Sequence, residues 1–233
     1  MKQIPIVILN RDRLDPTKRL VEALHIRGYF NITIIDNQST YEPLLSWYKE
    51  ADLDVFYNNI PETLYDTGTL YRLAAEVKHP KFVDIVKDYY IFTDSDTVPV
   101  EELPEDFVEH MVSICAKYGL HKVGLGLKID DLPMHQIAAQ KALEIEHQYW
   151  NGRIPDSTYE LYSAPIDTTF ALYSPNSPAL WGNSCYRMGG AYMVRHMPWY
   201  YDIANLPEDE LYYLQNLPGG RGPHYSWEMK QML

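Results

Sequence analysis

The sequence predicts an α/β fold, with a mainly parallel central sheet and helices on both faces. Short apolar runs alternate with amphipathic segments of helical period through the first half of the chain. Each apolar run is followed by polar residues, as expected where parallel strands end and ligands bind. The length of 233 residues and the 46% hydrophobic content suffice for one sizeable core.

Four strands and three helices are expected in roughly the first hundred residues. The strands are Ile4–Leu9, Ile32–Ile35, Leu53–Tyr57 and Tyr89–Pro99. The first of these is apolar throughout, which is typical of a strand buried on both faces. The helices are expected from Asp15 to Gly28, from about Tyr41 to Tyr48, and from Gly68 to Lys78. Asp15 is the expected N-cap, Pro16 fits a first turn, and Pro80 is expected to stop the third helix.

The second half continues the pattern and then changes texture. A helix is expected over Pro104–Tyr118, a strand over Lys122–Ile129 and a longer helix over Pro133–Trp150. From Tyr159 to about Tyr200 the chain is extended and rich in Tyr and Pro. Because no repeat or linker divides the sequence, we expect a single domain over residues 1–233.

Composition excludes several classes of partner. The net charge of −12 argues against nucleic acid and anionic membranes, which attract basic surfaces. No apolar run approaches the length of a membrane span, and the start lacks the features of a signal peptide, so a cytoplasmic protein is expected. Cys115 and Cys185 are the only cysteines; neither indicates a disulfide framework or a zinc site, and Cys115 fits a small buried thiol.

Two carboxylates follow the fourth apolar run in the string Thr93-Asp94-Ser95-Asp96. Side chains at i and i+2 of an extended chain point the same way, so Asp94 and Asp96 can face one site if the strand persists through Ser95. Two close carboxylates need a positive group between them, and a divalent cation carrying phosphate oxygens would supply it. The alternative is an ordinary turn, because Asp and Ser are common turn residues.

The same string allows two other functions. It fits the signature of haloacid-dehalogenase-type phosphatases, in which Asp94 would be the nucleophile and Asp96 an acid/base. That motif usually opens its domain, whereas three strand–helix units precede it here, and Asp130-Asp131 follows Asp96 too closely for the later acidic pair. A non-catalytic module that binds a sugar or a nucleotide is the third possibility.

Four strings occur together in the order and at the spacing of one known family. They are "IPIVILNRDR", "IIDNQST", "DTGTLYRLAAE" and "YYIFTDSDTVP". With them the chain resembles glycosyltransferases of the GT-A fold, family 2-like, from Ile4 to about Tyr213. Nucleotidylyltransferases share parts of this architecture, but their glycine-rich first loop is absent, because the first strand here ends in Asn10-Arg11-Asp12-Arg13.

The resemblance implies a single GT-A (Rossmann-like) domain and a set of site residues. About residues 1–100 would bind a nucleotide sugar, most readily a UDP-sugar, and about residues 101–233 a glycan or another hydroxyl acceptor. Mn²⁺ or Mg²⁺ would bridge the diphosphate and stabilise its developing charge. The implied metal ligands are Asp94, Asp96 and His196, with Asp96 the direct ligand. The implied nucleotide contacts are Asn10, Arg11, Asp36, Arg72, Asp94 and Ser95.

An inverting transfer also needs a carboxylate that deprotonates the acceptor. Asp167 is the first candidate, because it lies where an apolar-flanked segment meets a strand-like run. Glu208 and Asp209 are the second, since they resemble the acidic pair of many family 2 enzymes, although acidic residues after a proline also simply favour a helix start. Trp181, Trp199, Tyr200 and Tyr201 form a candidate platform for acceptor sugars or part of the core.

Overall fold

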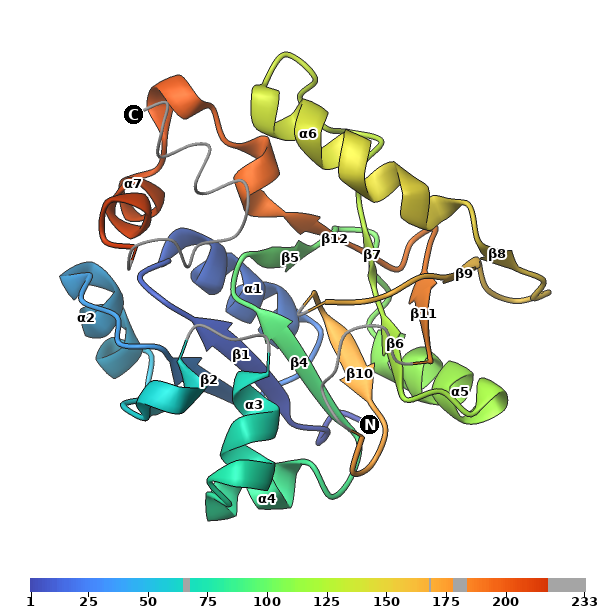
Figure 1. The fold of residues 1–233 in the computed structure, drawn as a ribbon, viewed down its shortest axis with the longest axis horizontal. Helices are drawn as coiled ribbons and strands as arrows, with labels where there is room; N and C mark the ends of the chain where they lie inside the picture. The colour runs from blue at the N-terminus through green and yellow to red at the C-terminus, as the bar shows by residue number, and fades with distance from the viewer. Residues whose placement is uncertain (65–67, 168, 178–183, 218–233) are drawn as a thin grey trace.

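The computed structural model describes residues 1–233 except 65–67, 168, 178–183 and 218–233. The described strands form a nine-stranded sheet in the order β3-β2-β1-β4-β10-β6-β11-β9-β8 and a three-stranded sheet in the order β5-β12-β7. In the large sheet only β10 and β9 run against the common direction, as the strand pairings show. This architecture confirms the predicted α/β class with a mostly parallel sheet (Figure 1).

The bounds of the elements are as follows. The strands are β1 Ile6–Asn10, β2 Ile32–Asp36, β3 Asp54–Tyr57, β4 Tyr90–Asp94, β5 Thr97–Pro99, β6 Lys122–Gly124, β7 Gly126–Leu127, β8 Arg153–Ile154, β9 Leu161–Ser163, β10 Ala171–Tyr173, β11 Cys185–Met188 and β12 Met193–His196. The α-helices are α1 Asp15–Ile26, α2 Glu42–Glu50, α3 Thr69–Tyr71, α4 Pro80–Ile85, α5 Phe107–Tyr118, α6 Ile137–Glu146 and α7 Glu208–Gln215, and α3 continues into a π-helical turn at Arg72–Glu76.

The core has two layers because β1 is buried on both faces. Ile6 and Ile8 point into the larger cluster, which includes the inner faces of α1, α2 and α5. Val7 points the other way, into a second cluster that includes Leu70 and Phe82 from α3 and α4. Helices therefore cover both faces of the sheet, as the apolar run of β1 predicted.

The fourth predicted strand divides where the two carboxylates lie. β4 ends at Asp94, a turn occupies Ser95 and Asp96, and β5 then joins the small sheet. The expectation that one strand continues through Ser95 is therefore wrong. The Thr97 hydroxyl donates to the Asp94 carbonyl at 3.0 Å and lies 2.6 Å from the Thr93 hydroxyl, and these contacts stabilise the turn.

Several further element boundaries differ from the prediction, among them the starts of the helices expected at Pro104 and Pro133, which begin at Phe107 and Ile137. The run Lys122–Ile129 forms β6 and β7 in two different sheets rather than one strand. Pro80 begins a new helix, α4, where it lacks an N–H that would need a partner. Leu14 rather than Asp15 is the N-cap of α1, and no side chain from this local segment caps the helix.

Two local features of the structure agree with the residue types found there. Gly28 and Gly119 follow α1 and α5 with positive φ angles of 79° and 61°, which is the conformation that favours glycine at helix ends. Cys115 is buried, and burial raises its pKa to about 11. Among the described residues no helix has both the length and the apolar character that a membrane crossing requires.

Candidate functional site

The candidate site lies at the carboxyl ends of three neighbouring strands. β1 pairs with β2 on one side and with β4 on the other, so the strand order reverses at β1. In open α/β sheets a ligand crevice lies outside such a reversal. Asn10, Asp36 and Asp94 are the last residues of these three strands. The fold therefore brings three of the predicted site residues to one edge.

Asn10 connects the polar groups of this edge. Its amide nitrogen donates to the Arg13 carbonyl at 3.0 Å and to the Tyr48 hydroxyl at 2.7 Å. Its amide oxygen accepts from the Ser95 hydroxyl at 2.8 Å. Asn10 and Ser95 are both buried, so these bonds satisfy polar groups that water does not reach. The first loop and the turn after β4 are thereby fixed to each other.

Asp36 and Asp12 hold the loops after β2 and β1. Asp36 is buried and accepts from the Ser39 amide at 2.8 Å. Burial raises the pKa of Asp36, while the hydrogen bonds from Ser39 oppose the shift. Asp12, with a φ of 55°, accepts from the amides of Thr40 and Tyr41 at 2.6 and 3.0 Å. Backbone amides thus stabilise both carboxylates without a bound ligand.

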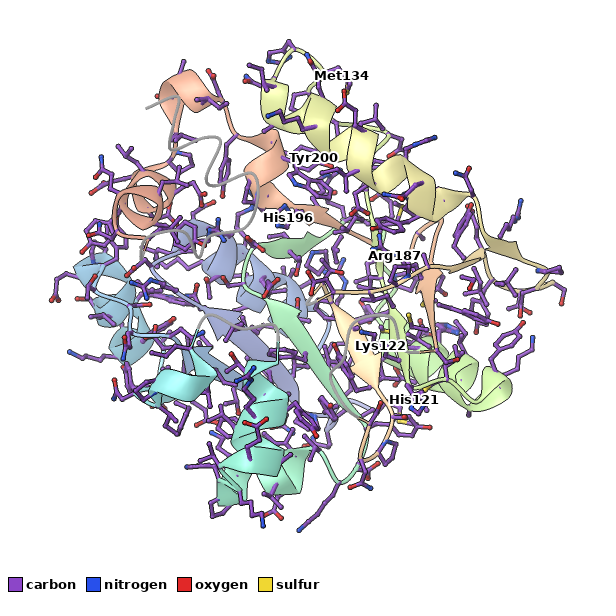
Figure 2. All side chains as sticks on the ribbon, in the orientation of Figure 1. His121, Lys122, Met134, Arg187, His196 and Tyr200 are labelled. Carbon is purple, nitrogen blue, oxygen red and sulfur yellow. The ribbon has the colours of Figure 1, made fainter. Side chains whose placement is uncertain are left out.

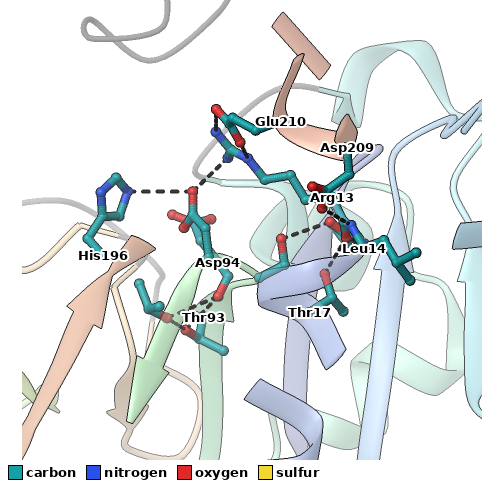
Figure 3. A network of polar contacts seen from close by, with 12 residues as sticks. Arg13, Leu14, Thr17, Thr93, Asp94, His196, Asp209 and Glu210 are labelled. Atoms are coloured by element: carbon teal, nitrogen blue, oxygen red, sulfur yellow. Dashed lines mark hydrogen bonds and ion pairs between the residues drawn. The ribbon is translucent and has the colours of Figure 1, made fainter. Parts of the chain in front are cut away.

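Asp96 forms a buried ion pair with Arg13. The Arg13 Nη1 lies 2.6 Å from Asp96 Oδ2, and its Nε and Nη2 bind the two oxygens of Glu210 at 2.7 and 3.0 Å. The guanidinium also lies 3.9 Å from the Tyr213 ring centroid. Figure 3 shows Arg13 extending toward Glu210, with His196 on the other side of the network. One cation therefore joins two buried carboxylates that are far apart in sequence.

The small sheet places His196 beside Asp96. In the pairing of β12 with β5, His196 lies opposite Thr97, and the Met197 amide donates to the Asp96 carbonyl at 2.8 Å. The His196 Nε2 is 3.5 Å from Asp96 Oδ2. Burial lowers the pKa of His196, so the ring is neutral at neutral pH and could act as a ligand nitrogen.

The fit of these groups to a divalent cation depends mainly on Asp96. Its Oδ1 is buried and accepts no hydrogen bond from the described residues, whereas its Oδ2 is held by Arg13. The described residues contain no cluster of three or more His, Cys, Asp or Glu arranged as a metal centre. A carboxylate oxygen that accepts no hydrogen bond can serve as one ligand of Mg²⁺ or Mn²⁺, if the ion takes its other ligands from phosphate and water. Ligation by Asp94 and His196 stays a prediction.

The candidate bases have different surroundings. Asp209 is buried, and its Oδ2 accepts from the backbone amides of Leu14 and Asp15, both at 2.7 Å. Glu208 is exposed at the start of α7. Asp167 is exposed in the segment that enters β10, and this strand runs antiparallel to β4. Asp209 thus has a structural role at the start of α1, whereas Asp167 lies at the surface.

Buried Lys122 orders the backbone next to Asp167. Its Nζ donates to the Ile166 carbonyl at 2.6 Å. Burial lowers the pKa of Lys122, while the charges of Cys185 and Asp167 oppose this shift. In Figure 2 Lys122 lies in the part of the sheet that contains β6 and β10. A buried ammonium thus holds the backbone carbonyl that precedes Asp167, whereas Asp167 itself is exposed.

The two arginines predicted to contact the nucleotide lie in different places. Arg11 donates to the carbonyls of Asn37 and Asn216 at 3.2 and 3.3 Å, at the edge of the site. Arg72 is the first residue of the π-helical turn after α3. The next residue, Leu73, packs in the second core cluster, so this turn covers the face of the sheet to which Val7 points. Its contact with a nucleotide stays a prediction.

The candidate aromatic platform is largely part of the core. Trp199 and Tyr201 are buried, and the Trp199 ring lies 4.6 Å from the ring of His196. Tyr200 is half-buried, and its hydroxyl donates to the Lys128 carbonyl and to Asp131. Trp181 lies outside the described residues. The three described aromatics therefore support the small sheet and His196.

Sequence reasoning missed Arg13 and Glu210 as members of the site. Arg13 stands two residues after Arg11 in the polar string that follows β1, and Glu210 follows the predicted acidic pair. The only available signal was the requirement that a buried carboxylate have a cationic partner. Nothing in the sequence indicated which arginine would supply it.

Comparisons with known proteins add little to this geometry. No family model matches the chain, and no curated protein matches it. Among solved structures, a putative glucose-1-phosphate thymidylyltransferase from Bacillus anthracis in complex with a sucrose is similar at 12% sequence identity and a TM-score of 0.34. The match covers 98% of this chain and 81% of that chain.

Proposed function

We propose that this chain is a glycosyltransferase of the GT-A type. It would move a sugar from a nucleotide-sugar donor, a UDP-sugar first of all, to a hydroxyl of a glycan or another acceptor. The observation that carries the proposal is the convergence of Asn10, Asp36, Ser95 and Asp96 where the strand order reverses. The ordered set of four sequence strings supports the same activity.

The residues at this edge suit the parts of a nucleotide sugar. Asp36 is a buried acceptor that can bind an N–H of the base or a ribose hydroxyl. Asn10, Arg11 and Arg72 would contact the nucleoside or its phosphates, and Asp94 and Ser95 the ribose. The sugar would then point away from these strands toward the second half of the chain.

Asp96 would bind Mn²⁺ or Mg²⁺ through Oδ1, with Asp94 and His196 as further ligands, and the ion would stabilise charge on the leaving diphosphate. Arg13 keeps the other oxygen of Asp96 in place during this binding. Asp167 would take the proton of the acceptor hydroxyl as that oxygen attacks the anomeric carbon. Its exposure leaves the carboxylate accessible to an acceptor.

Ligand-dependent thermal unfolding tests this proposal. UDP-, GDP- and dTDP-sugars are each added with and without Mn²⁺, and a nucleotide sugar that binds the native state raises the midpoint. We expect metal-dependent stabilisation by one nucleotide in the wild type and its loss in Asp96→Ala. Asp84→Ala is the control, because it removes an exposed carboxylate of α4 that has no role in the proposed site. Absence of stabilisation, together with a phospho-aspartate at Asp94, would establish the phosphatase instead.

A further inference from the structure

Helix α7 is attached to the site by polar contacts and by the ring of Tyr212, which packs against the main core with its centroid 5.0 Å from that of the Tyr41 ring. Asp209 accepts hydrogen bonds from two backbone amides at the start of α1, and Glu210 forms an ion pair with Arg13. The Tyr212 hydroxyl lies 3.1 Å from the Thr40 hydroxyl. The buried apolar residues of α7, Tyr213 and Leu214, form a separate small cluster outside the main core. A helix of eight residues is marginal alone, so its position depends on these contacts.

Arg13 is the group through which α7 reaches Asp96. Its planar guanidinium uses Nε and Nη2 on Glu210 and Nη1 on Asp96. The N–H donors of a guanidinium lie in one plane and cannot rotate independently, so together they fix the orientation of each bound carboxylate. Since Oδ2 of Asp96 is held in this way, the direction in which Oδ1 points is also fixed. The three side chains are buried, so water does not compete for these bonds.

We propose that Arg13 and Glu210 are positioning residues that make ligand binding at Asp96 depend on the docking of helix α7. This inference rests on the proposed donor site and adds α7 as the element that orients Asp96 through Arg13. Binding and docking are then linked reciprocally. A nucleotide bound at Asp96 stabilises the docked helix by the same free energy with which the docked helix favours the nucleotide.

Glu210→Gln is the informative substitution, because glutamine keeps the shape of the side chain but removes its charge. Arg13 then loses one of its two charged partners and holds Asp96 less firmly. We expect the affinity for UDP with Mn²⁺ to fall about tenfold or more, as it does when partners of metal-ligating carboxylates are changed. Arg13→Lys should have a similar effect, since an ammonium keeps the charge but lacks the planar set of donors that binds two carboxylates at once.

The buried pair Arg187–Glu146 offers a matched control. Arg187 Nη1 lies 2.6 Å from Glu146, and Arg187 is 5% exposed, compared with 6% for Arg13. Figure 2 shows Arg187 near β11, on the side of the molecule away from α7. Glu146→Gln therefore removes an equivalent buried charge without touching Asp96. We expect it to change stability but to leave the dissociation constant of UDP within about twofold of wild type, as for distant independent sites.

Calorimetric titration and amide hydrogen exchange test the proposal together. The titration uses UDP with Mn²⁺ on the wild type, Asp96→Asn, Glu210→Gln, Glu146→Gln and the double variant Asp96→Asn/Glu210→Gln. In the double variant the second substitution should cause no further loss, because Glu210 acts through Asp96. Exchange should show that the ligand protects the amides of residues 211–215 in the wild type and not in Glu210→Gln.

Two results would overturn the inference and leave the donor site standing. One is a Glu210→Gln protein that binds like Glu146→Gln, and the other is α7 exchange that the ligand does not change. If Glu210→Gln does not fold, Arg13→Lys and the exchange of wild-type α7 still decide. A wild type that binds no nucleotide rejects the proposed function itself.

Discussion

Asp96 is connected, directly or through Arg13, to three separated parts of the chain. Arg13 follows β1, Met197 follows β12, and Glu210 in α7 reaches it through Arg13. The sequence predicted Asp96 itself, because polar residues after parallel strands meet at one edge. It could not predict Glu210 as partner of Arg13, since this pair spans 197 positions and no local pattern marks it.

At the same scale, Asp167→Asn tests the proposed base. Asparagine keeps the size of the side chain but cannot take a proton, so transfer should fall by about 100-fold or more while donor affinity is unchanged. The measurement is release of UDP from a UDP-sugar in the presence of a panel of saccharide acceptors, alongside a binding titration. Asp84→Asn, an exposed substitution in α4, should leave both quantities unchanged. Full transfer by Asp167→Asn would redirect the search to Glu208.

Among the elements, α1 shows how a local rule can be replaced by a tertiary contact. The sequence predicted the helix and its first-turn proline, but it placed the cap on Asp15. The structure supplies the cap from α7, where Asp209 accepts the amides of Leu14 and Asp15. At Ser95-Asp96 the sequence left a continuous strand and a turn both open, and the structure has the turn, because pairing of β5 with β12 decides where β4 ends. The period of the apolar residues therefore predicts that a helix or strand is present more reliably than it predicts where that element ends.

Asp209→Ala should therefore destabilise the protein although the residue lies on another helix. Loss of a capping carboxylate costs about 1–2 kcal/mol in the free energy of unfolding, because two amides at the helix start lose their acceptor. Urea unfolding followed by circular dichroism measures the change. Glu208→Ala removes the exposed neighbouring carboxylate and should stay within about 0.5 kcal/mol of wild type. Equal stability of the two variants would contradict the capping role.

On the scale of the whole molecule, buried tyrosines make stability depend on alkaline pH. The chain has 20 tyrosines, and several are fully buried in the core, among them Tyr48, Tyr90 and Tyr173. Tyr90 and Tyr173 stack with ring centroids 5.0 Å apart. Burial raises the pKa of all three above its usual value. The folded protein therefore keeps phenol protons that the unfolded chain releases.

Stability should accordingly fall as pH rises above about 10, where tyrosines titrate in the unfolded chain. The sign follows because the unfolded state then binds fewer protons than the folded state. Each such group contributes up to about 1.4 kcal/mol per pH unit. Urea unfolding between about pH 8 and pH 11 should show a smaller slope for Tyr90→Phe than for wild type. Tyr57→Phe, at an exposed position, should leave the slope unchanged.

The contact between α7 and the loop after β1 also has a consequence for the order of synthesis. Strands β1 to β4 emerge from the ribosome before α7 and can pair with one another as the chain grows. Arg13 and Asp96 are then already present, but Glu210 and Asp209 follow more than a hundred residues later. A nascent chain can therefore build the sheet edge well before it can complete the site. At the proposed donor site, an unfinished chain would for this reason bind a nucleotide sugar more weakly than the complete chain.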